Sequence, residues 1–65
     1  MNTSVQILES RIDSINNAIA QMRKDATNAT RANVEMAIEM LAMPELEKVQ
    51  AELEQFRQDM LAKNV

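Results

Sequence analysis

The sequence predicts an all-α fold, a helical hairpin or coiled-coil-like unit of two to three helices that associates into a helical bundle. Glycine is absent and proline occurs once, so the chain has few residues that form tight turns. No segment alternates apolar and polar residues between turn signals, as a strand would. One hydrophobic repeat with spacings of three and four residues is the positive signal, and Asn33 is its only polar member. Its positions are Val5, Leu8, Ile12, Ile15, Ile19, Met22, Ala26, Ala29, Asn33, Met36, Met40 and Met43.

A first helix is expected over residues 4–24. Thr3 and Gln6 fit a capping box, in which the two side chains satisfy free backbone donors at the start of a helix. The apolar stripe of this segment is narrow, and its other face is mostly Ser, Asn, Gln and charged residues. One face is therefore expected to pack against another helix.

The next segment, about residues 25–30, has two interpretations. Thr27, Asn28 and Thr30 are mediocre helix formers that favour caps and turns. As a loop, the segment would lead into a second helix over residues 31–43. As a helix, it would continue the repeat and place Asn33 in the apolar seam, where a buried polar residue can fix register.

The expected second helix is apolar on two faces. Met36, Met40 and Met43 form one stripe, and Val34, Ile38 and Leu41 form another. Such a helix is expected to be covered from two sides. We therefore predict that this segment lies at the centre of the assembly.

A helix is expected over residues 45–63, and Pro44 sets its relation to the preceding one. Proline suits the first turn of a new helix, which predicts a corner. The alternative is one long helix kinked at Pro44, because a second stripe runs through this position without interruption. Its members are Val34, Ile38, Ala42, Leu46, Val49, Leu53, Phe56 and Met60.

The composition argues against an enzyme. The chain has no Cys and no His, which removes the commonest nucleophile–base pairs and the commonest metal ligand. Without glycine it cannot form a glycine-rich phosphate loop. Glu35 and Glu39 lie one helical turn apart but are interpreted as solvated carboxylates, so neither a metal nor a cofactor is expected.

The prediction is a single domain over residues 1–65 that acts as a non-enzymatic protein–protein interaction module. A chain of this length buries too little surface to cover so many apolar side chains alone. We expect a homo-oligomer, most simply a dimer, a helical protein partner, or both. The module would be a small adaptor, chaperone or inhibitor, or a self-assembling structural subunit. The residues expected to carry association are Ile12, Ile15, Ile19, Met22, Met36, Met40, Met43, Leu53 and Phe56.

The alternative is a small nucleic-acid-binding regulator of the dimeric helical-hairpin type that uses Arg23, Lys24 and Arg31. The net charge of −3 argues against a polyanion as the main ligand. No membrane association is expected, because the longest apolar run is the four residues 40–43. No secretory signal is visible and Cys is absent, so we expect a cytoplasmic protein.

Overall fold

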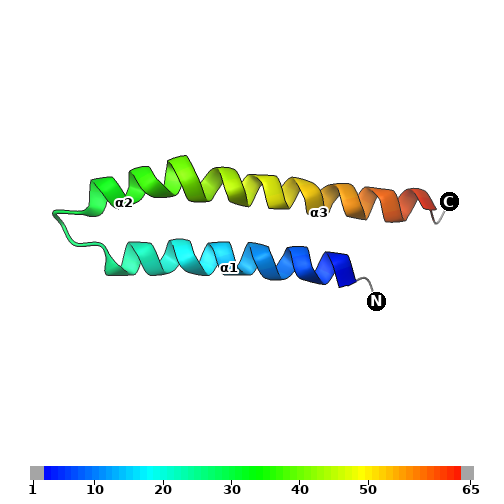
Figure 1. Ribbon diagram of the computed structural model, residues 1–65, viewed down its shortest axis with the longest axis horizontal. Coiled ribbons are helices and arrows are strands. Elements are labelled where there is room, and N and C mark those ends of the chain that lie inside the picture. Colours follow the sequence, from blue (N-terminus) through cyan, green and yellow to red (C-terminus); the bar gives the residue numbers. More distant parts are fainter. Residues whose placement is uncertain (1–2, 64–65) are drawn as a thin grey trace.

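The computed structural model describes residues 3–63, which form a helical hairpin of two antiparallel arms (Figure 1). The first arm is α1 (Thr3–Asp25). The second arm runs through α2 (Arg31–Ala37), the π-helical segment η1 (Ile38–Ala42) and α3 (Met43–Lys63). The hairpin measures 54 × 19 × 11 Å, and the described ends of both arms lie at the same end of it. No strand occurs among residues 3–63, so the predicted all-α hairpin is confirmed.

The ambiguous segment is a loop over residues 26–30. The Thr27 backbone N–H donates to Thr30 Oγ1 at 2.9 Å, and the Thr30 N–H donates back to the Thr27 carbonyl at 3.2 Å. The two threonine hydroxyls lie 3.0 Å apart. The chain has no glycine, and the reversal does not need one, because no described residue has a positive φ. Asn33 lies exposed in α2 rather than in the seam between the arms.

The chain does not turn a corner at Pro44. The backbone N–H of Met43 donates to the carbonyl of Ile38, five residues earlier, and the helical path continues into α3. Pro44 thus lies in the first turn of α3, as its chemistry favours, but within one continuous arm. The sequence left open whether Pro44 makes a corner or lies within one long, kinked helix, and the structure has one continuous helical arm with no corner (Figure 1).

The π-helical turn follows from the spacing of the buried stripe. Val34, Ile38, Ala42 and Leu46 are separated by four residues three times in succession. In a regular α-helix, twelve residues overshoot three full turns by about 120°. One extra residue in a π turn absorbs about 100° of that excess, since each residue turns the helix by about that amount. All four side chains can therefore face α1.

Apolar side chains fill the space between the arms in two adjoining clusters. Leu8, Val49 and Leu53 form the cluster nearer the described ends. Ile19, Ile38 and Leu46 form the cluster nearer the loop. Ile12 and Ile15 pack against both, so the core is continuous along the hairpin. Ile38 and Val49 are the most deeply buried, at 1% and 0% exposure.

Three exposed ion pairs join the arms at their margins. They are Arg11–Glu45 at 3.4 Å, Arg23–Glu35 at 2.9 Å and Arg57–Glu9 at 3.4 Å. Exposed pairs of this kind contribute about 0–1 kcal/mol each. They therefore add little to the stability of the hairpin, which rests mainly on the apolar core.

Candidate protein-interaction face

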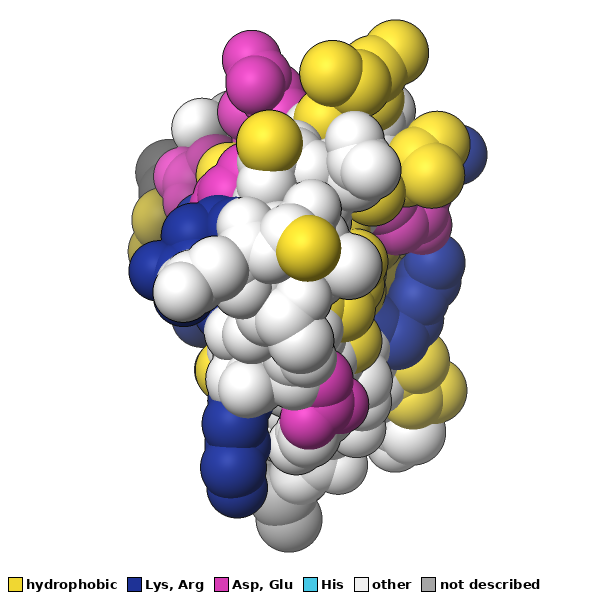
Figure 2. All heavy atoms as spheres, turned by 90° about the vertical axis from the view of Figure 1, so that its left-hand side faces the viewer, with side chains coloured by type: hydrophobic (Ala, Val, Ile, Leu, Met, Phe, Trp, Pro, Cys, Tyr) yellow, Lys and Arg dark blue, Asp and Glu magenta, His cyan; other side chains and the backbone are white. Residues whose placement is uncertain are grey.

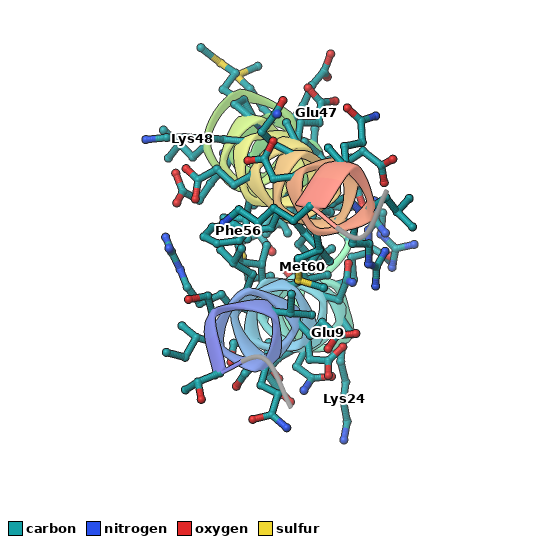
Figure 3. The ribbon with its side chains drawn as sticks, turned by 90° about the vertical axis from the view of Figure 1, so that its right-hand side faces the viewer. Glu9, Lys24, Glu47, Lys48, Phe56 and Met60 are labelled. Atoms are coloured by element: carbon teal, nitrogen blue, oxygen red, sulfur yellow. The ribbon has the colours of Figure 1, made fainter. Side chains whose placement is uncertain are left out.

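The residues predicted to carry association divide into two groups. Ile12, Ile15, Ile19, Met22 and Leu53 lie between the two arms and form part of the hairpin core. Met36 and Met40 point away from α1 and are 58% and 67% exposed. Met43 and Phe56 are also exposed, but less so, at 37% and 41%. In the view along the hairpin, Phe56 lies at the edge of the space between the arms, whereas Met60 lies inside it (Figure 3).

Met36 and Met40 therefore lie outside the core that joins the two arms. The repeat of the first helix extends through Met36 and Met40 only if the helical phase is uninterrupted. The loop at residues 26–30 breaks that phase. The second arm can therefore face α1 with the stripe that contains Val34 and Ile38, and these two β-branched residues take the inward positions.

Position along the sequence tells which residues face outward. A residue two positions after an inward one lies about 200° further around the helix. Met36 follows Val34 by two, Met40 follows Ile38, and Pro44 follows Ala42. Lys48 follows Leu46 by two and is the next outward position after Pro44. The outer surface of the second arm is thus apolar from Met36 to Pro44 and becomes charged at Lys48.

Leu41 enlarges this surface on one side. It is 74% exposed, the highest value among the large apolar side chains of residues 3–63, and follows Met40 directly. Seen from the loop end, hydrophobic side chains gather over the second arm, at the top of the view, and project beyond the polar surface (Figure 2). We define Met36, Met40, Leu41 and Pro44 as the methionine face. Its members occupy about two turns of one helix, which is the contact length of a docked helix.

Carboxylates border the other side of the methionine face. Glu35, Glu39, Glu47 and Glu54 each come one position after an inward residue, so they share one flank of the arm. Glu35 is paired with Arg23, and Glu54 accepts a hydrogen bond from Gln58 at 3.4 Å. Among residues 3–63, neither Glu39 nor Glu47 has an ion-pair partner. Glu47 points outward from the arm, toward the upper right in the view along the hairpin, whereas Lys48 points to the left (Figure 3).

The Arg23–Glu35 pair is the best-formed ion pair of the hairpin. Arg23 Nε and a terminal guanidinium nitrogen donate to the two carboxylate oxygens at 2.9 and 3.2 Å. Hydrogen bonding by Arg23 lowers the pKa of Glu35, partial desolvation opposes this, and the positive charges of Arg23 and Arg31 lower it further. The same hydrogen bonds and the Glu35 charge raise the pKa of Arg23.

This pairing bears on the nucleic-acid alternative. Arg23, Lys24 and Arg31 lie close together in the sequence around the loop, as that interpretation requires. However, Arg23 is already engaged by Glu35, and Asp25 follows Lys24. Phosphate binding depends on clustered cations that are free to contact the backbone of a nucleic acid. The loop end offers fewer of these than the sequence suggested.

No group of three or more His, Cys, Asp or Glu side chains within residues 3–63 is arranged to hold a metal ion. In the same range, no helix combines the length and apolar character needed to cross a membrane. Comparisons with protein-family models, curated proteins and solved structures found no match to this chain.

Sequence reasoning missed two parts of the face. Leu41 was assigned to the second stripe together with Ile38, but the π turn rotates it outward. The flanking row of carboxylates was also missed as a unit, although its regular spacing after inward residues was visible. Finding it required knowing which stripe faces α1.

Proposed function

We propose that this protein is a non-enzymatic, cytoplasmic interaction module that binds a helix on its methionine face. One observation carries the proposal. Met36, Met40 and Leu41, all more than half exposed, lie next to one another on an arm whose opposite side packs against α1. Contiguous exposed apolar surface is typical of binding sites. The thioether side chains adapt to differently shaped partners, as in other methionine-lined helix-binding surfaces.

The residues of the hairpin core are different from those of the methionine face. Ile12, Ile15, Ile19, Met22 and Leu53 hold the two arms together, which leaves the outside of the second arm free for a partner. An adaptor, chaperone or inhibitor would use this face for another protein. A self-assembling subunit would use it for a second copy, most simply in a dimer.

Site-specific photocrosslinking tests the proposal in cells. A photoreactive amino acid at position 40 should yield discrete protein adducts, because Met40 is the centre of the methionine face. The matched control carries the same group at Asn17, an exposed residue of α1 two positions after Ile15. Adducts at position 40 that are missing at position 17 support the proposal, whether they contain another protein or a second copy. Equal or absent labelling at position 40, with a monomeric purified protein, would contradict it.

A further inference from the structure

Resting on the proposed function, we infer that the occupant of the methionine face is an amphipathic helix with a basic flank, rather than a second copy of this chain. The apolar residues of that helix cover Met36, Met40 and Leu41. Its Lys or Arg side chains lie opposite Glu39 and Glu47. The inference comes from the charges that border the face.

The first step concerns Glu39 and Glu47. Both lie on the same flank of the second arm, one before and one after Pro44, and neither has an ion-pair partner within residues 3–63. Glu45, by contrast, faces the opposite flank and is held by Arg11. The hairpin therefore pairs carboxylates where its own arginines reach them, and leaves two free beside its exposed apolar surface.

The second step concerns self-association. In an antiparallel two-fold pair built on the second arm, each flank meets the same flank of the other copy. Glu39 and Glu47 would then face the same carboxylates of the second copy. Lys48 is the single basic residue between positions 32 and 56, so few cations are available to offset them. Like charges placed together at an interface disfavour that partner.

The third step concerns which chemistry complements the face. A partner helix needs about two turns of apolar residues at spacings of three and four to cover the methionine face. Basic residues beside that stripe would meet Glu39 and Glu47 across the rim, where opposite charges speed encounter and select partners. The net charge of −4 in residues 34–65 adds a long-range attraction for a basic segment.

The experiment uses two synthetic helical peptides of 21 residues with the same Leu heptad stripe. One carries Lys at the positions beside the stripe, and the other carries Glu there. Binding to the full chain is measured by calorimetry and by fluorescence anisotropy at low and moderate salt. We expect the lysine peptide to bind at least about tenfold more tightly than the glutamate peptide, with an affinity that falls as salt rises.

Paired variants locate the charge effect. Glu39→Gln with Glu47→Gln should weaken the lysine peptide about five- to tenfold, as expected for the loss of two rim ion pairs. Glu52→Gln with Asp59→Asn changes the net charge equally but lies on the opposite flank, one position before Leu53 and Met60. That control should weaken binding less than twofold. Equal effects of the two variants would overturn the inference, because they would reduce it to overall charge.

Met36→Gln with Met40→Gln separates the inference from the proposed function. It should abolish peptide binding while the circular dichroism spectrum stays unchanged, since both side chains are exposed. Leu61→Gln, at an exposed apolar residue near the end of α3, is its control.

If the methionine variant has no effect on peptide binding, the proposed face itself is wrong. If it abolishes binding but both peptides bind the parent equally, only the basic partner is rejected. A parent that sediments as a dimer and becomes monomeric in the methionine variant would assign the face to a second copy and overturn the inference.

Discussion

The backbone N–H of Met43 donates to the carbonyl of Ile38, and this bond places one extra residue in the helix immediately before Pro44. Proline has no N–H to donate, and in a regular α-helix its ring collides with the carbonyl four residues earlier. The widened turn shifts the carbonyls that precede Pro44 from their α-helical positions. The same turn keeps Ile38 and Leu46 on the side that faces α1.

Deletion of Leu41 tests this relationship. It would restore alternating spacings of four and three to the inward stripe, which fit an uninterrupted α-helix. Pro44 would then lie inside that helix at a cost of about 3 kcal/mol. We expect the deletion alone to be less stable than the deletion combined with Pro44→Ala by about this amount, as measured by urea denaturation. Equal stabilities of these two variants would show that the π turn does not accommodate the proline.

Ile38→Ala should destabilise the hairpin by about 2–5 kcal/mol, because it removes a fully buried side chain and leaves a cavity. Met40→Ala, two residues away on the exposed side, should change the free energy of unfolding by less than about 0.5 kcal/mol. Chemical denaturation followed by circular dichroism compares them directly. Similar losses in both variants would mean that the second arm is turned differently from the arrangement described above.

Ile15→Asp should unfold the hairpin, since Ile15 packs against both core clusters and connects them. Ile15 is partly buried, and a carboxylate there would lose part of its hydration against apolar side chains, which is costly. Ile7→Asp is the control on the same helix, because Ile7 is 55% exposed. Helicity at 222 nm should collapse only in the first variant, together with any association. Retained helicity and an unchanged sedimentation coefficient in Ile15→Asp would reject its place in the core.

Thr30→Val should destabilise the hairpin by about 0.5–1.5 kcal/mol while keeping the shape of the side chain. The hydroxyl of Thr30 accepts a hydrogen bond from the Thr27 N–H in the loop, and valine cannot replace it. The comparison is Asn28→Ala, in the same turn. Thermal unfolding should show a lower midpoint for the valine variant than for the alanine variant. No difference between them would indicate that the threonine hydroxyls do not hold the reversal.

The pH dependence of Glu35 follows from its lowered pKa. A carboxyl whose pKa is lower in the folded state favours folding while it is ionised, at pH above its ordinary value. This contribution is lost as the pH falls from that value through the lowered one. Titration of the Glu35 side-chain carbon by NMR should show a lower midpoint in the parent than in Arg23→Gln. Identical midpoints would indicate that the Arg23–Glu35 pair does not form in solution.

Much of this fold could be predicted from local sequence. The apolar repeat of α1, the poor helix formers around Thr27 and Thr30, and the stripe through Pro44 predicted a helix, a candidate loop and a candidate continuous arm. Local sequence could not show which of the two apolar stripes of residues 31–43 is buried against α1. Both have helical spacing, and periodicity alone does not say which of two apolar faces is covered.

The sequence by itself determined that the chain is helical. Its apolar residues recur at helical spacings, and without glycine and with one proline it has few residues that form the tight turns of a sheet. The tertiary structure decided which of these residues are buried in the hairpin. The loop broke the phase of the repeat. The π turn keeps the stripe from Val34 to Leu46 on the side that faces α1, and Met40 and Leu41 lie on the outside. The methionine face thus results from how the two arms pack.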